Sequence, residues 1–151
     1  MLRQVFTDRL KEAMKARDSR TVSTVRLILA GLKERDVAAR GQGNLDGLSE
    51  AEIQRMLQGM IKQRRESIVL FEQGNRPDLA QQENEEIAII ESFLPTQMTE
   101  EAIAAAARST ITETGAAGIR DMGKVMAALR QRHAGSMDFS RASAIVKQLL
   151  G

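Results

Sequence analysis

Two charged residues interrupt the apolar stripes of neighbouring predicted helices, and they are the first candidates for chemistry in this sequence. At 100° per residue, Arg64 lies in the centre of the apolar face of a helix that Ser49 begins and that runs to about Glu72. Glu83 lies in the same way on the next helix, over about residues 78–93. A tight turn between these helices would bring Arg64 and Glu83 within roughly one helical turn, ~5 Å along the axis. We therefore expect a structural ion pair of Arg64 and Glu83, with phosphate or partner-carboxylate binding by Arg64 as the alternative.

A second group of charged residues lies near the C-terminal end of the chain and is basic. Residues 123–151 contain 5 Lys and Arg against 1 Asp or Glu. A basic surface without aromatic side chains suits the phosphates of folded RNA, which proteins recognise by shape and backbone charge. The alternative is an ordinary solvated face. The candidate phosphate contacts are Lys124, Arg130, Arg132, Arg141 and Lys147.

Several kinds of chemistry are excluded by residues that the sequence lacks. It has no Cys, and His133 is its single His, so thiol chemistry, a two-histidine metal site and a histidine-bridged triad cannot form within one copy of the chain. With no Trp, no Tyr and 4 Phe, stacking platforms for single-stranded nucleic acid are nearly absent. The glycine motifs of nucleotide-binding loops are absent too. We expect no catalytic residue, no metal and no cofactor.

Four glutamates crowd the predicted helix over residues 78–93 and resemble a carboxylate cluster. Di-metal helical bundles combine such carboxylates with a Glu-x-x-His motif, and no His lies near these residues. We interpret the cluster as a solvated acidic face with one buried member. Its residues are Glu83, Glu85, Glu86 and Glu91.

Helical periodicity runs through nearly the whole chain and predicts the elements that position these residues. Apolar residues recur three and four positions apart, and no stretch alternates as a strand would. We predict an all-α protein of about seven helices, in which the third and fourth form an antiparallel hairpin. The predicted helix caps are Asp18, Ser49, Thr99, Asp121 and Ser140.

A proline marks the predicted domain boundary. Pro95 ends the preceding helix, so we expect an N-terminal helical domain over residues 1–94 and a small three-helix domain over residues 95–151. The second domain has only ~55 residues, a size at which a single core gives limited stability. We expect it to lean on the first domain or on a partner.

The sequence also carries expectations about location. The longest apolar runs, such as Ile87 to Ile90, are far shorter than the ~20 residues that span a membrane, and the first residues show no signal-peptide core. We expect a cytoplasmic protein that is not bound to a membrane.

Five short segments carry a recognisable family pattern. They are Val25 to Ala30, Lys62 to Ser67, Gly74 to Leu79, Phe93 to Pro95 and Asp121 to Met126. With them the sequence resembles the YqeY-like proteins (GatB/YqeY) over nearly its whole length. Its C-terminal part is similar to the tail domain of the B subunit of tRNA-dependent amidotransferases. The resemblance implies an all-helical protein of two domains, the second of the tail type.

The resemblance also implies a function. In the amidotransferases the tail binds the body of the tRNA, whereas glutamine handling and amide transfer belong to larger domains that this chain lacks. It therefore implies a non-catalytic protein that binds tRNA or tRNA-like RNA, accessory to aminoacylation or amidation. By position, the tail's glycines correspond to Gly123 and Gly135, which would shape the approach of the RNA. The family usually follows the second glycine with Lys or Arg, whereas this chain has Ser136.

Two other functions stay open at this point. One is a protein-protein adaptor, with Met56 and Met60 offering adaptable apolar grooves to a protein partner. The other is a partner-dependent carbon-nitrogen ligase with glutamine as amido-nitrogen donor, the activity that the family label carries. The sequence leaves the RNA, the protein partner and the oligomeric state undetermined.

Overall fold

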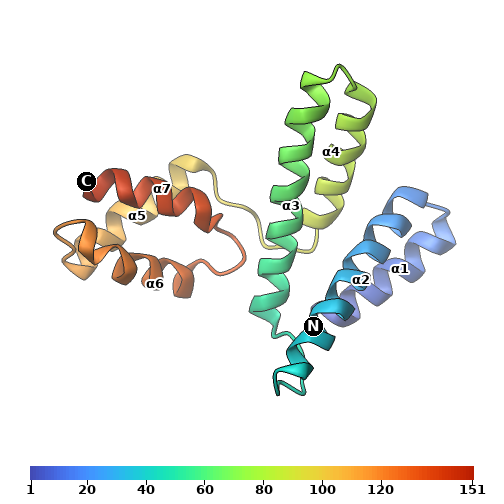
Figure 1. Cartoon of the computed structure of the whole chain (residues 1–151), viewed down its shortest axis with the longest axis horizontal. Coiled ribbons are helices and arrows are strands. Elements are labelled where there is room, and N and C mark those ends of the chain that lie inside the picture. Colours follow the sequence, from blue (N-terminus) through green and yellow to red (C-terminus); the bar gives the residue numbers. More distant parts are fainter. The chain divides into compact units, whose positions relative to one another are not determined.

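Seven α-helices and one short 3₁₀ helix account for the regular structure of the chain (Figure 1). The computed structural model describes all residues 1–151 and contains no β-strand, which confirms the all-α prediction. None of the helices is long and apolar enough to cross a membrane. The helices are α1 (Leu2–Ala16), α2 (Ser19–Gly41), α3 (Glu50–Gln73), α4 (Pro77–Glu91), α5 (Glu100–Thr114), η1 (Ile119–Asp121), α6 (Met122–Arg132) and α7 (Phe139–Leu150).

The chain divides into two compact units, Met1–Leu94 and Pro95–Gly151. The N-terminal unit contains two helix hairpins, α1 with α2 and α3 with α4, and the C-terminal unit contains α5, α6 and α7 (Figure 1). Each unit has its own cluster of buried apolar side chains.

Local capping chemistry explains where most of the helices begin. Asp18 accepts a hydrogen bond from the amide of Thr21 at the start of α2, and Thr99 accepts one from Ala102 at the start of α5. Ser49 begins α3 with a complete capping box, because it accepts from Glu52 N while the Glu52 carboxylate accepts from Ser49 N.

Two of the predicted caps differ from the structure: Asp121 is the N-cap residue of α6 but its side chain makes no cap bond, and Ser140 is not the cap of α7. The carboxylate of Asp121 accepts from the backbone N–H of Ala117 at 2.9 Å and makes no cap bond with α6. It turns back toward the preceding loop because η1 already brings the chain into helical conformation before α6. At α7 the cap is Asp138 rather than Ser140, since its Oδ1 accepts from the amides of Ser140 and Arg141 at 3.0 and 3.3 Å.

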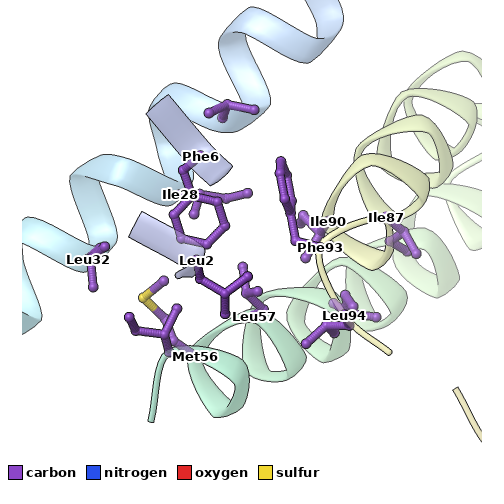
Figure 2. Close-up of a cluster of buried hydrophobic side chains, with 13 residues drawn as sticks. Leu2, Phe6, Ile28, Leu32, Met56, Leu57, Ile87, Ile90, Phe93 and Leu94 are labelled. Carbon is purple, nitrogen blue, oxygen red and sulfur yellow. The ribbon is translucent and has the colours of Figure 1, made fainter. Parts of the chain in front are cut away.

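The core of the N-terminal unit joins the first and last parts of that unit. The rings of Phe6 and Phe93 meet edge to face, with centroids 4.9 Å apart and planes at 84° (Figure 2). Leu2 and Leu94 are buried in the same cluster. Met56 also lies in this core, only 2 % exposed, so it offers no surface groove to a partner and the proposed role of Met56 in an adaptor is corrected.

A buried carboxylate fastens α1, α2 and the loop before α3 to one another. Arg3 donates two hydrogen bonds to Asp36, Nη1 to Oδ2 at 2.6 Å and Nη2 to Oδ1 at 2.9 Å. The amide of Leu48 donates to Asp36 Oδ1 at 2.9 Å. These bonds lower the pKa of Asp36 from 3.8 to about 2, with the Arg3 hydrogen bond as the largest cause.

Gly47 is required at this site by both conformation and space. Its φ is +76°, and a Cβ atom built on it would lie 2.4 Å from Asp36 Oδ1. The loop can therefore close over the Asp36 carboxylate only with glycine at this position.

The C-terminal unit has a smaller core that its own loops close. Val125 and Leu129 from α6 pack with residues from α5 and α7, and Met137 from the loop before α7 is fully buried with them. The segment before α5 is bound to that same loop, because Gln97 Nε2 donates to Gly135 O and the Met98 amide donates to Ser136 O, each at 2.8 Å.

Candidate nucleic-acid interface

Arg64, the first candidate for chemistry, lies inside the α3–α4 hairpin. Its Nε is 3.9 Å from Glu83 Oε2 and 3.0 Å from Glu86 Oε2, and its Nη1 donates to the carbonyl of Met60 at 3.2 Å. The side chain of Arg64 is 13 % exposed. Both carboxylates thus lie against the Arg64 guanidinium, which is the arrangement of an ion pair. A site for an external phosphate would leave the guanidinium free.

Glu86 is the member of this group that the sequence analysis missed. It was assigned to a solvated acidic face, whereas the residue is only 8 % exposed and makes the shorter contact with Arg64. The spacing held a signal, since Glu86 is three positions after Glu83 and residues three apart share one side of a helix. Burial raises the pKa of Glu83, the nearby charge of Glu86 raises it further, and Arg64 offsets part of the rise.

The acidic residues do not form a metal centre. No group of three or more His, Cys, Asp or Glu side chains is placed so that it could hold a metal ion. Glu85 and Glu91 instead pair with Arg20 and Arg65 at 3.1 and 3.2 Å.

The basic residues of the C-terminal unit are arranged by the amphipathic helix α6. Val125, Met126 and Leu129 are buried, which turns Lys124 outward into solvent. Arg130 and Arg132 are two positions apart, so they leave the helix ~200° apart around its axis. Their contacts confirm that they point to different sides, since Arg132 contacts α5 and Arg130 contacts Phe139, the first residue of α7.

Three of the predicted phosphate contacts already have partners within the unit. Arg132 Nη1 forms an ion pair with Glu113 Oε2 at 2.5 Å, and Arg141 Nε lies 3.6 Å from Asp138 Oδ2. The guanidinium of Arg130 lies 6.0 Å from the centroid of the Phe139 ring, the outer limit of a cation–π contact. Glu113 could not be recognised from the sequence, because its pairing with Arg132 depends on how α5 packs against α6.

Lys124 and Lys147 differ from these arginines. Both are exposed, and neither has an ion pair or a side-chain hydrogen bond. The structure therefore engages three of the five predicted cations in contacts within the unit. It leaves Lys124 and Lys147 as the cations of the set that are free to meet an external anion.

The two glycines of the predicted site play different parts. Gly123 lies in the exposed first turn of α6, and a Cβ added there would contact nothing within 4 Å. Gly135 is buried and has φ +80°, a conformation that favours glycine, so its role in the unit is to form the turn before α7. Of the two, only Gly123 lies where a ligand could approach the backbone directly.

The sequence is similar to one protein family and to several fungal proteins. A family model described as "Yqey-like protein" matches residues 3–150. The protein "Altered inheritance of mitochondria protein 41, mitochondrial" of Lachancea thermotolerans is 36 % identical over 85 residues, which is 56 % of this chain and 43 % of the relative. The protein of the same name from Eremothecium gossypii is 34 % identical over 113 residues, which is 68 % of this chain and 60 % of the relative.

These relatives limit what can be carried over and correct one expectation. The chain spans about half the length of the curated relatives it matches. Their names describe them as mitochondrial, which overturns the prediction of a cytoplasmic location. That prediction was wrong because it depended on short apolar runs and on first residues that show no signal-peptide core, and neither feature distinguishes the cytoplasm from the mitochondrion.

Proposed function

The chain belongs to the YqeY-like family, and from this premise we propose that it is a non-catalytic helical protein that binds tRNA or tRNA-like RNA through its C-terminal unit. In this proposal the RNA backbone is held at the start of α6 and on the exposed side of α7. The protein would act as an accessory to aminoacylation or amidation of tRNA rather than as the enzyme itself.

The observation that carries the proposal is the start of α6. No side chain caps this helix, but η1 precedes it directly and the Met122 amide donates to Ile119 O. Gly123 leaves the backbone uncovered, and Lys124 beside it is exposed and unpaired. An exposed first turn with an adjacent lysine is a favourable place for a phosphate, because the helix dipole and a full positive charge act together and Gly123 puts no side chain in the way.

The other cations contribute unequally. Lys147 is free and can contact a further phosphate without losing a partner. Arg132 and Arg141 would first have to leave Glu113 and Asp138, which lowers the net gain from a phosphate contact. We therefore assign the larger part of the affinity to Lys124 and Lys147 and a smaller part to Arg130.

The experiment is a titration of the full chain with total tRNA and with duplex DNA, repeated over a series of salt concentrations. Each lysine–phosphate contact adds ~0.7 to 0.9 to the slope of log affinity against log salt. The double variant Lys124→Glu/Lys147→Glu should lose both contacts, so its slope should fall by about 1.5 and its tRNA affinity should drop at least tenfold at low salt.

The matched control reverses two exposed lysines of the N-terminal unit, Lys11→Glu/Lys62→Glu, and changes the net charge by the same amount. This control should bind tRNA with nearly the affinity of the wild type, with only a small loss of affinity from its changed net charge. Equal effects of the two double variants would show that net charge alone drives binding and would refute the assigned surface. Equal affinity of the wild type for tRNA and duplex DNA would refute the preference for tRNA.

A further inference from the structure

An open groove of about 860 Å³ lies on the N-terminal unit, and none of the residues assigned to RNA lines it. It is formed by the end of α1, the first two turns and more of α2, and the middle of α4. The residues of α2 that line it include Ser19, Val22, Ser23, Arg26 and Leu27. These residues lie along one side of α2 over ~12 Å. Two of them are serines, whose small side chains cover little of the helix backbone.

The groove presents apolar surface to solvent. Met14 is 52 % exposed and Leu27 is 49 % exposed, and the half-buried Val22 belongs to the same lining. Methionine adapts its shape to irregular apolar surfaces, which suits a binding face. Scattered exposed apolar residues are normal, but here they share one groove with a distinct charge pattern.

The charges of the groove are not balanced within the protein. Arg20 pairs with Glu85, and the buried Glu86 is bound by Arg64. Arg17 and Arg26 are exposed and form no ion pair and no side-chain hydrogen bond. The groove therefore has an apolar lining with two arginines whose positive charge nothing in the unit neutralises.

Arg17 occupies a backbone position that other residue types fill more easily. It follows α1 with φ 56°, and the bonds Asp18 N to Ala13 O and Arg17 N to Met14 O make a Schellman motif. The same motif ends α5 with Gly115 and follows α3 with Asn75, the residue types that prefer this conformation. An arginine adopts this conformation less readily than glycine does, so the fold does not require an arginine side chain at this position.

We propose that this groove binds an acidic amphipathic helix of a protein partner, with Leu27 and Met14 contacting its apolar side and Arg17 and Arg26 its carboxylates. Charge complementarity selects the acidic partner, because two unpaired guanidinium groups flank the apolar surface. A helix is the partner structure that an all-helical groove accommodates, since the unit has no strand edge to which an extended peptide could add.

The probes for the test are model helical peptides of about 15 residues with one apolar side and a polar side of Glu, Gln or Lys. Binding of each labelled peptide to the full chain is measured by fluorescence anisotropy. The Glu peptides should bind about tenfold more tightly than the Gln peptides, and the Lys peptides should bind least. Arg17→Gly and Arg26→Gln should each weaken Glu-peptide binding about three- to tenfold, and Leu27→Glu should weaken it more.

Arg17→Gly is the decisive variant because glycine suits the backbone at this position. Its thermal stability should equal or exceed that of the wild type while its peptide affinity falls, a combination that a purely structural role of Arg17 would not give. Arg55→Gln and Leu70→Glu make the same chemical changes at exposed positions of α3 outside the groove and should leave binding unchanged.

Three results would overturn the proposal. They are no binding of any Glu peptide, equal binding of Glu and Lys peptides, and unchanged Glu-peptide binding in the three groove variants. Loss of tRNA affinity in Arg17→Gly and Arg26→Gln without any peptide binding would assign the face to RNA instead. The variant Lys124→Glu/Lys147→Glu should bind the Glu peptides normally, so failure of the RNA proposal and failure of this one are distinguishable.

Discussion

Replacing Asp36 by Asn should remove a pH-dependent part of the stability of the N-terminal unit. The amide keeps the size of the side chain but loses the charge that Arg3 contacts and one of the two acceptor oxygens. The fall of the Asp36 pKa from 3.8 to about 2 corresponds to ~2.4 kcal/mol at ~1.36 kcal/mol per unit. Because the Arg3 side chain is 41 % exposed and solvent screens part of the pair, we expect about 2 kcal/mol at pH 7.

The sign of the pH dependence follows from the direction of the shift. A lowered pKa means that the unfolded chain takes up the proton first, so the contribution is complete above pH ~4 and is lost as the pH falls toward 2. The wild type and Asp36→Asn should therefore differ by about 2 kcal/mol at neutral pH and converge in acid.

The assay is urea unfolding followed by far-ultraviolet circular dichroism, since the chain has no Trp or Tyr to report by fluorescence. The resonance of the Leu48 amide, which donates to Asp36 Oδ1, gives a local measure and should titrate near pH 2. The control Asp46→Asn removes an exposed carboxylate from the nearby loop and should change stability by less than ~0.5 kcal/mol. A difference between wild type and Asp36→Asn that stays constant from pH 7 to pH 2 would refute the electrostatic reasoning.

Four further substitutions test other parts of the same unit. Glu86→Gln should cost ~2 kcal/mol in urea unfolding at pH 7 because it removes the closer carboxylate of Arg64. Glu83→Gln should leave the free energy of unfolding at pH 7 nearly unchanged or raise it, since the raised pKa of Glu83 means that the folded protein favours the neutral side chain. The wild type should become more stable as the pH falls toward 4.5, and the variant should lack this gain. Gly47→Ala should lower the melting temperature by an amount equivalent to ~3 kcal/mol, because φ is +76° and the new methyl would meet a buried carboxylate, and a neutral result would contradict this loop geometry. Ser49→Ala should cost ~1 kcal/mol through loss of the capping box, and amide exchange in the first turn of α3 should rise with it.

Local sequence information was enough for the helices and for the α3–α4 hairpin with its Arg64–Glu83 contact, but not for contacts between residues far apart in the chain. Thr99 and Ser49 were recognised as caps because a cap depends on residues within three positions. The pair of Arg3 and Asp36 could not be found in this way, since it joins residues 33 positions apart and depends on the packing of α1 against α2. In the C-terminal unit, α6 periodicity correctly turned Lys124 outward, but the partner of Arg132 lies on another helix.

The contact between Phe6 and Phe93 has a consequence for synthesis of the chain. A ribosome makes α1 first, and the Phe6 ring has no aromatic partner until nearly the whole N-terminal unit has emerged. Phe93 and Leu94 follow the last residue of α4, so a fragment that ends with that helix would leave the same surface uncovered. Fragments made to separate the two units should therefore end no earlier than Leu94, since shorter ones would expose the apolar surface of α1 and α2.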